Sequence, residues 1–508
     1  MSTIVQSPPF LWNPFAPGAD RVATSVRLVD PARDPANVLL ASCLSALIIV
    51  GMVAMRDDML HWFLLPVFLC GALIGPDMVG WLRGKVDIFD PVGILGAYGY
   101  FFFFIAPLLT VMWNFHTREL VEPPDWIGWI GWMSVINAFG LVIYLAARKI
   151  LPASRPRTVW RLQPSLFFAG ISIALPVTFA FQIYVFNKFG GVLAFMGAYS
   201  NGNADDLVGM GWQFLIAEYF PIFLGLLFLV WKRDFLRQRS WGFLVLLVIG
   251  FFVVKMLFGG LRGSRSNTVW GVFWLVGAIH LWVRPVPRKA IVVGVLLLGT
   301  FMYYYGFYKA EGVRAFDAID DPSRIGVMEE KSGRTLDAAL LGDMARTEIQ
   351  SQLLYRLWSV GDYDYSFGAT YAEAFDILIP RSIWPDRPDG KVRKGTEALY
   401  GRDVYNARVF RASQVYGLAG EAMLNFPPIF APLSFFILAL VVLKARNLML
   451  ADADDIRWLL LPVLANLVVV VLVGDVDNLL WFFFEAVLGP LVLLRASCRP
   501  MPRVSGQT

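Results

Sequence analysis

The chain repeats apolar stretches that are each long enough to form a membrane-spanning helix. A helix needs about 20 predominantly apolar residues to cross the hydrocarbon core of a bilayer, and twelve stretches approach that length. They cover residues 38–55, 59–80, 92–113, 126–147, 165–186, 212–231, 241–258, 268–283, 289–308, 427–443, 456–474 and 478–495. The sequence therefore predicts an all-α polytopic membrane protein with about twelve transmembrane helices, of which the eighth is short.

The composition agrees with this class and disfavours others. Hydrophobic residues make up 57% of the 508 residues and charged residues 16%, whereas soluble domains are about 45–50% apolar and about 25% charged. The net charge of +5 is weak support for nucleic-acid binding, because the Lys and Arg residues of a membrane protein mainly set its topology. We expect membrane lipid, and no nucleic acid, among the partners.

The basic residues collect in alternate loops between the predicted helices. If the twelve helices alternate in direction, just over half of the 44 Lys and Arg residues lie on one side, together with both termini. The positive-inside rule then places both termini in the cytoplasm. The short loops on the opposite side hold only Arg56, Arg118, Lys188, Arg262 and Arg265.

The predicted helices divide the chain into unequal parts. Residues 1–37 form a polar, Pro-rich cytoplasmic tail, 38–308 a membrane bundle of nine spans, 427–495 three further spans, and 496–508 a second cytoplasmic tail. The remaining stretch, 309–426, is far longer than a usual connection and contains many aromatic residues that can bury one another. We therefore expect one large, folded periplasmic loop of short helices there.

The connection FGGLRGSRSNTVWG (258–271) carries Arg262 and Arg265 on the side where topology gives no reason for them. Its glycines permit tight turns, and Ser266 or Asn267 can cap the helix that follows. A helix N-terminus attracts anions, and the arginine fork matches phosphate oxygens. We interpret this connection as a site for phosphate or diphosphate. Alternatively, both arginines bind lipid headgroups or a nearby Asp.

Three ionisable residues lie inside predicted spans at similar depths. They are Lys255, Glu218 and Glu485. Charged side chains within a membrane usually mark a pathway or a site, which makes Lys255 a candidate substrate-binding residue. The alternative is a structural ion pair between Lys255 and either glutamate.

The long loop offers further candidates for binding a saccharide. The segment IPRSIWPDRPDGK is stiffened by proline and displays Arg381 and Trp384, which suit a charged group and a sugar ring. The alternative is an ordered surface turn. Glu373 and Asp376 are three residues apart and would share one face of a helix, so Glu373 is a second-choice acid that would bind substrate.

A carboxylate near the end of this loop is the strongest candidate for a catalytic base. Arg408 and Arg411 approach the membrane again, and Glu421 follows about one turn before the tenth span. A carboxylate at the membrane surface can remove a proton from an attacking group, and Arg411 can stabilise a leaving phosphate. Glu421 would otherwise only neutralise one of the arginines.

The Cys and His residues show no pattern that binds a metal. Cys43, Cys70 and Cys498 lack the spacing of a disulfide framework or a zinc site, and the three histidines are isolated. We therefore expect no metal and no cofactor.

Three short motifs and the order of the spans resemble one protein family. The motifs are GGLRGSRS before a span, IPRSIWPDRP in the long loop and GLAGEAMLNFPPIFAPL entering the next span. In these features the chain resembles the Wzy-type oligosaccharide repeat-unit polymerases, which include the O-antigen and exopolysaccharide polymerases of bacterial envelopes. Pro427 replaces the glycine that often follows Asn-Phe in the last motif, a departure that concerns the local turn.

The resemblance implies an activity, partners and a location. Such proteins look like members of the multi-span glycosyltransferase class that uses lipid-linked donors (GT-C-like). They transfer a growing glycan from undecaprenyl diphosphate to a new lipid-linked oligosaccharide unit at the periplasmic face of the cytoplasmic (inner) membrane. Donor and acceptor would therefore be undecaprenyl-diphosphate-linked oligosaccharides, with a chain-length regulator and a flippase as further expected partners. Arg262, Arg265 or Arg411 would stabilise the diphosphate, and Glu421 would act as the base.

Two other functions fit parts of the sequence. An O-antigen ligase-like glycosyltransferase resembles the chain in topology, but members of that class usually place a functional histidine in the long outer loop, and 309–426 contains none. A lipid-linked oligosaccharide transporter or flippase would also have many spans. Transporters often consist of two related halves, whereas these spans divide into nine and three.

Overall fold

A computed structural model describes residues 28–502 apart from a few short segments. The described residues are 28–117, 120–200, 210–262, 265–312, 324–332, 335–379, 383–384, 390–406, 414–452 and 454–502. Within these segments the side chains of residues 197–200, 262, 265, 309–311, 324, 330–332 and 377 are not described.

Ten helices in the described part of the chain are long and apolar enough to cross a membrane. They are α1 (Pro35–Met55), α2 (Leu64–Leu82), α3 (Pro91–Tyr100) continued by α4 (Ala106–Met112), α5 (Trp126–Ile150), α6 (Pro164–Lys188), α8 (Gly211–Trp231), α11 (Arg265–Ala278) continued to Val283, α12 (Arg288–Glu311), α19 (Phe435–Met449) with the turn Pro428–Ser434 before it, and α21 (Val476–Phe482) continued by α22 (Leu488–Ala496). The chain is thus an all-α, multi-pass membrane protein apart from one pair of short strands.

The remaining two of the twelve predicted spans are shorter apolar helices. They are α10 (Trp241–Leu257), with 17 residues, and α20 (Leu461–Val473), with 13 residues. The prediction of about twelve spans is therefore confirmed for ten. Helix α20 is short because it follows a separate 3₁₀ turn, Ile456–Leu459, and ends before Gly474, which has an extended backbone.

One pair of short antiparallel strands was not expected from the sequence. Strand β1 (Thr158–Leu162) pairs with β2 (Cys498–Pro502), with Trp160 opposite Pro500. The guanidinium groups of Arg457 and Arg495 lie 5.3 Å and 5.5 Å from the Trp160 ring, within the range of cation–π attraction. The predicted C-terminal tail therefore contributes a paired strand before the described residues end at 502.

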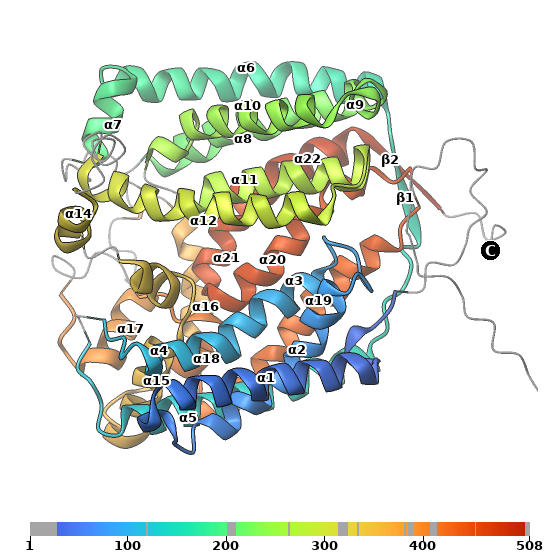
Figure 1. The fold of residues 1–508 in the computed structure, drawn as a ribbon. Coiled ribbons are helices and arrows are strands. Elements are labelled where there is room, and N and C mark those ends of the chain that lie inside the picture. The colour runs from blue at the N-terminus through green and yellow to red at the C-terminus, as the bar shows by residue number, and fades with distance from the viewer. Residues whose placement is uncertain are drawn as a thin grey trace, which may run out of the picture.

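The connections predicted to carry the excess of basic residues meet at one end of the bundle, here called the strand end because β1 and β2 lie there (Figure 1). Arg148, at the end of α5, pairs with Asp77 in α2 and with Asp30 before α1. Arg446, at the end of α19, pairs with Asp90 at the start of α3 at 2.9 Å. Buried cations are thus matched by carboxylates, as buried charges require.

Short helices occupy the opposite end, here called the loop end (Figure 1). Within the described parts of 309–426 they are α14 (Arg324–Ser332), α15 (Thr347–Tyr355), α16 (Ala369–Glu373), α17 (Gly390–Tyr400) and α18 (Gly417–Asn425). The short helix α7 (Val192–Ser200), which follows α6, also lies at the loop end, whereas α9 (Arg233–Gln238), which follows α8, lies at the strand end. The sequence predicted short helices in this stretch, and the structure describes them, whereas a single folded periplasmic unit stays a prediction.

Helix α20 connects two groups of packed helices. Val468 and Leu472 belong to an apolar core formed mainly by α2, α3, α5, α15, α18 and α19. Leu461 and Val463 belong to a second core formed mainly by α6, α8, α11 and α22. Because α20 is shared by both cores, its end at Val473 and the start of α21 lie between the two helix groups.

Candidate functional site

Glu421 lies in α18 with its carboxylate at the first residue of α21. One oxygen, Oε2, accepts a hydrogen bond from the Val476 backbone N–H at 2.7 Å, and Oε1 accepts one from Thr370 Oγ1 at 3.3 Å. The residue is buried. Because the first N–H groups of a helix lack partners within it and attract negative charge, Glu421 caps α21 from another helix.

Asp475 caps α18 in the same manner. Its Oδ1 atom accepts hydrogen bonds from the backbone N–H groups of Gly417, at 2.7 Å, and Tyr416, at 3.0 Å. Gly417 has a φ of +72°, a left-handed conformation that favours glycine. We call these two interactions the reciprocal caps: α18 supplies the cap of α21, and the residue before α21 supplies the cap of α18.

A buried lysine completes this group. The ammonium of Lys391, in α17, lies 2.6 Å from Asp475 Oδ2 and 2.8 Å from Asp477 Oδ1. Lys391 and Asp475 are both buried, whereas the Asp477 side chain is 28% exposed. We call the set Thr370, Lys391, Glu421, Asp475 and Asp477 the carboxyl cluster.

The charges of the carboxyl cluster follow from burial and from its hydrogen bonds. Burial and the negative charge of Asp475 raise the pKa of Glu421 to about 8, although the Val476 N–H and the Lys391 charge act in the opposite direction. Burial lowers the pKa of Lys391, but the two aspartates more than offset this and raise it. Glu421 therefore holds a proton at neutral pH and releases it in mildly alkaline solution.

The surroundings of Asp475 act on its charge in opposite directions. Burial raises the pKa of Asp475 above its usual value, and the charge and the hydrogen bond of Lys391 offset this only in part. Its two oxygens accept from the Lys391 ammonium and from two backbone N–H groups, and donors of this kind favour the charged form. The pKa values of Asp475 and Glu421 are thus both raised by burial, and the donors around Asp475 act against that effect.

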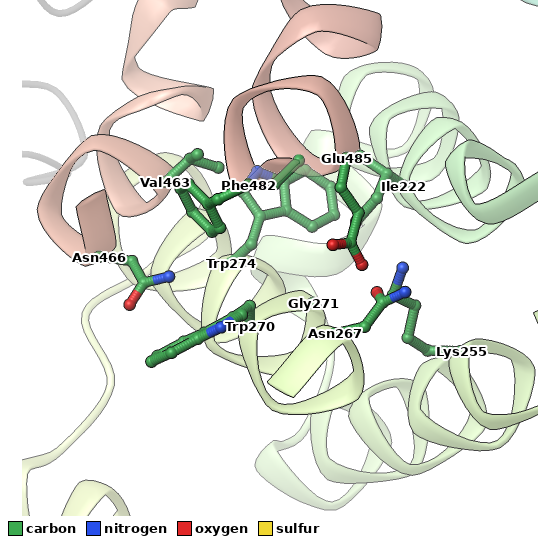
Figure 2. A pocket seen from close by; sticks show the side chains of 11 residues that line it. Ile222, Lys255, Asn267, Trp270, Gly271, Trp274, Val463, Asn466, Phe482 and Glu485 are labelled. Carbon is green, nitrogen blue, oxygen red and sulfur yellow. The ribbon is translucent and has the colours of Figure 1, made fainter. Parts of the chain in front are cut away.

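A second polar cluster lies around a pocket within the bundle (Figure 2). The Asn267 amide donates to Glu218 Oε2, and the Lys255 ammonium donates to the Glu218 backbone oxygen at 3.3 Å. Lys255, Asn267 and Glu485 line the pocket with Trp270, and the Glu485 carboxylate points toward Asn267 and Lys255 in Figure 2. We call Glu218, Lys255, Asn267 and Glu485 the pocket cluster.

Helix α21 joins the two clusters. Val476, its first residue, binds Glu421 of the carboxyl cluster, and Glu485 lies nine residues further along the same continuous helix. At a rise of 1.5 Å per residue, the backbones of Val476 and Glu485 are about 14 Å apart. A movement of this helix would therefore shift residues of both clusters.

The connection 258–271 approaches the pocket cluster through Gly259. A Cβ atom at Gly259 would lie 2.7 Å from Asn267 Nδ2 and 3.2 Å from Glu218 Cδ. The turn Gly260–Arg262 that follows is held by α12, where the Tyr308 hydroxyl donates to the Leu261 carbonyl at 3.0 Å. The pocket cluster and the backbone of the Gly–Arg turn are therefore neighbours.

This close approach gives a stability prediction. We expect Gly259→Ala to lower the free energy of unfolding by about 1–3 kcal/mol, because the new methyl group overpacks the Glu218–Asn267 contact. Gly250→Ala in α10 is the matched control, since nothing lies within 4 Å of its Cβ position and alanine favours a helix. Thermal unfolding of the purified proteins in detergent measures both. Equal stabilities of the two variants would contradict the proposed packing of Gly259.

The structure brings some of the predicted site residues together. Lys255 and Glu485, which the sequence placed at similar depths with Glu218, line one pocket, and the Lys255 ammonium donates to the backbone oxygen of Glu218. Glu373 ends α16, and burial followed by the charge of Asp376 raises the pKa of Glu373. The two acids are thus close, as their spacing predicted, although α16 gives way to a 3₁₀ turn between them.

The other predicted residues are exposed or fall outside what the structure describes. Trp384 is 38% exposed. Arg381, Arg408 and Arg411 lie outside the described residues, and the side chains of Arg262 and Arg265 are not described. The predicted gathering of arginines around Glu421 therefore stays a prediction. Lys391 lies beside Asp475 and acts on the charge of Glu421, and the charge of Arg346 interacts with that of Asp475.

Lys391 and Asp475 were missed by sequence reasoning. The segment GDVDN between the last two spans places two acids, Asp475 and Asp477, at a membrane edge. This signal marks both as candidates and does not distinguish between them. Lys391 was hidden in the run KVRK, where three of four residues are basic and only burial distinguishes them. Among the described residues, no group of three or more His, Cys, Asp or Glu side chains is placed to hold a metal ion. The prediction that no metal takes part stays untested.

The ten long apolar helices in the described part of the chain define its class as a multi-pass, all-α membrane protein. No model of a known protein family matches the sequence, and no solved structure matches the fold.

Proposed function

We propose that the chain is a glycosyltransferase that polymerises undecaprenyl-diphosphate-linked oligosaccharide units in O-antigen or exopolysaccharide biosynthesis. The observation that carries the proposal is Glu421, a buried carboxyl group with a pKa raised to about 8, which lies outside the membrane-spanning helices at the loop end of the bundle. A general base works best when its pKa is near the operating pH.

The proposed reaction transfers the glycan in one displacement. The oxygen of an acceptor sugar hydroxyl forms a bond to the anomeric carbon of the donor glycan. The bond between that carbon and the diphosphate oxygen breaks, and its electron pair leaves with undecaprenyl diphosphate. The hydroxyl proton passes to the ionised Glu421 carboxylate, which therefore has to release its own proton first. The products are a glycan longer by one unit and free lipid diphosphate.

The leaving diphosphate needs positive charge. We assign this role to Arg262, Arg265 and Arg411, since fixed cations that face a developing charge are among the largest contributions to catalysis. Support comes from the backbone of the Gly260–Arg262 turn, which neighbours the pocket cluster, and from α21, which leads from that cluster to Glu421. Arginines in this role make a metal unnecessary, and Arg381, Trp384, Arg408, Lys255 and Glu373 would contact the saccharides or the lipid headgroup.

The proposed location is the bacterial inner membrane with both termini in the cytoplasm. The strand end, where Arg148 and Arg446 meet their carboxylate partners, would face the cytoplasm by the positive-inside rule. The loop end, with the carboxyl cluster, would then face the periplasm, where lipid-linked units are joined.

One observation also favours a transporter of lipid-linked oligosaccharides. Glu218 of the pocket cluster is buried inside a spanning helix, and Lys255 is buried in the shorter apolar helix α10. Buried charges within apolar helices are a feature of many transporters. Deleting the gene separates the two functions. Loss of a polymerase leaves single lipid-linked units on the outer face of the membrane, whereas loss of a transporter leaves them on the inner face.

Incubation of the purified, full-length protein with its substrate tests the proposal directly. The substrate is undecaprenyl-diphosphate-linked oligosaccharide extracted from the deletion strain, and products are separated by size. We expect a ladder of polymers, both with and without a metal chelator. The absence of any ladder from folded protein would contradict the polymerase function, and a ladder that disappears with chelator would contradict the assignment of the arginines.

A further inference from the structure

The carboxyl cluster contains a buried charge that the proposed reaction does not itself use. Lys391 lies in α17, where the charged side chains differ in burial: the Arg393 side chain is 57% exposed, whereas that of Lys391 is 6% exposed. Removing an ammonium group from water is unfavourable, and apolar residues often replace buried ion pairs without loss of stability. The burial of Lys391 therefore calls for an explanation beyond packing.

Lys391 is connected to Glu421 through Asp475. The Lys391 ammonium binds Asp475 at 2.6 Å, Asp475 binds the backbone N–H of Gly417 at 2.7 Å, and Glu421 is in the first two turns of the helix that Gly417 begins. Glu421 in turn binds the N–H of Val476, the residue after Asp475. These contacts form a closed circuit through α17, α18 and the start of α21.

We propose that Lys391 and Asp475 are positioning residues that fix the Glu421 carboxyl through the reciprocal caps and set the pH at which it becomes a base. This inference rests on the proposed function, because it assigns a base to that reaction. Neither residue has to touch the substrate. Lys391 holds Asp475, Asp475 holds the start of α18, and the two charges act on Glu421 in opposite directions.

Several ionisable groups around Glu421 contribute to its charge. Arg346, which precedes α15, lies near Gly417, and its charge interacts with that of Asp475. Asp475, before α21, and Asp477, within it, favour the protonated form, and Lys391 of α17 favours the ionised form. Tyr371 of α16 also faces the carboxyl, and the charge of Glu421 contributes to raising the pKa of its phenol group. Because a neighbouring charge shifts a pKa by about 1–3 units, removing the lysine and removing the aspartate are expected to have opposite effects.

The test measures the ionisation of Glu421 without relying on activity. Infrared difference spectra between the full-length protein and Glu421→Gln, both in lipid nanodiscs, report the protonated carboxyl at each pH. We expect Lys391→Met to raise the midpoint of this titration by about one pH unit and Asp475→Asn to lower it by a similar amount. The Asp475→Asn substitution keeps the size of the side chain, and its amide oxygen can still accept from the N–H groups of Gly417 and Tyr416.

The polymerisation rate gives a second readout and separates this inference from the proposed function. The rise of kcat with pH is expected to move in the same direction as the infrared midpoint in both variants, and Lys391→Arg is expected to restore the wild-type profile. Arg393→Met, which removes an exposed charge from the same helix, is expected to leave both midpoints unchanged. Thermal unfolding confirms that each variant is folded.

The outcomes are distinct. Midpoints that stay fixed, or that move in the same direction in both variants, would overturn the positioning role even if the wild-type protein makes polymer. Midpoints that move as expected in a protein that makes no polymer would support the link between Lys391 and Glu421 and reject the proposed reaction. If Lys391→Met does not fold, Asp475→Asn and the part-exposed Asp477→Asn provide the test. Both are expected to lower the infrared midpoint, and a midpoint that stays fixed in both would overturn the positioning role.

Discussion

Glu421→Gln is expected to lower the rate of polymerisation by about 10²–10⁴-fold, the range that a general base contributes. Glutamine keeps the size of the side chain, and its amide oxygen still accepts from the Val476 N–H, so the start of α21 keeps its cap. It has no carboxylate to receive the hydroxyl proton. The loss should therefore fall on kcat, measured with extracted lipid-linked units and purified protein.

The control for this variant is Asp364→Asn, which changes an acid that is 80% exposed and pairs with Arg402 at 3.1 Å. Its polymerisation rate should stay within about twofold of the wild-type rate, since surface pairs contribute little. A Glu421→Gln protein that is folded and polymerises at the wild-type rate would show that another group removes the proton.

Arg148→Met is expected to lower the free energy of unfolding by about 3–5 kcal/mol, because it leaves the buried Asp77 carboxylate without its cation. The Arg148 side chain is 5% exposed and binds Asp77, which is fully buried, as well as Asp30 and the Tyr144 hydroxyl. Thermal unfolding in detergent measures the loss. Because Arg148 lies at the strand end, the polymerisation rate of each folded molecule should not change.

Two further variants test whether charge is the cause. Lys149→Met removes the neighbouring cation, which is exposed, and should leave the unfolding temperature close to that of the wild type. Adding Asp77→Asn to Arg148→Met removes one stranded carboxylate, so the double variant should be more stable than Arg148→Met alone. A double variant that is less stable than the single one would rule out the unpaired charge as the reason.

The membrane helices were predictable because their signal is local. Ten of the twelve predicted spans are long, apolar helices, and the length and polarity of a stretch suffice to recognise each one. The proximity of Lys255 to Glu218, and its place with Glu485 at one pocket, agree with their similar depths in the sequence, because residues at the same depth in packed helices can meet. The predicted sides of the membrane and the roles of these residues stay predictions.

The carboxyl cluster was not predictable, because its contacts join distant parts of the chain. Lys391 and Asp475 are 84 positions apart, and Glu421 and Val476 are 55 apart. The periodicity and spacing of residues in a sequence indicate which side chains are neighbours on the same helix. They do not indicate which residues of a distant helix or turn pack against that helix. The pairing of β1 with β2 was missed for the same reason, since Thr158 and Pro502 come from opposite halves of the sequence.

The reciprocal caps also limit how this chain can be recombined with relatives. The first turn of α18 is capped by Asp475, and the first turn of α21 is capped by Glu421 of α18. If residues 414–425 alone were replaced by the matching segment of a related protein, the new acid would face an N-terminus of α21 with which it did not evolve. Chimaeras that exchange 414–425 and 474–478 together would keep both matches. We expect hybrid proteins in which only one of the two segments is exchanged to have poorly capped N-termini in both α18 and α21, even where their membrane spans are similar.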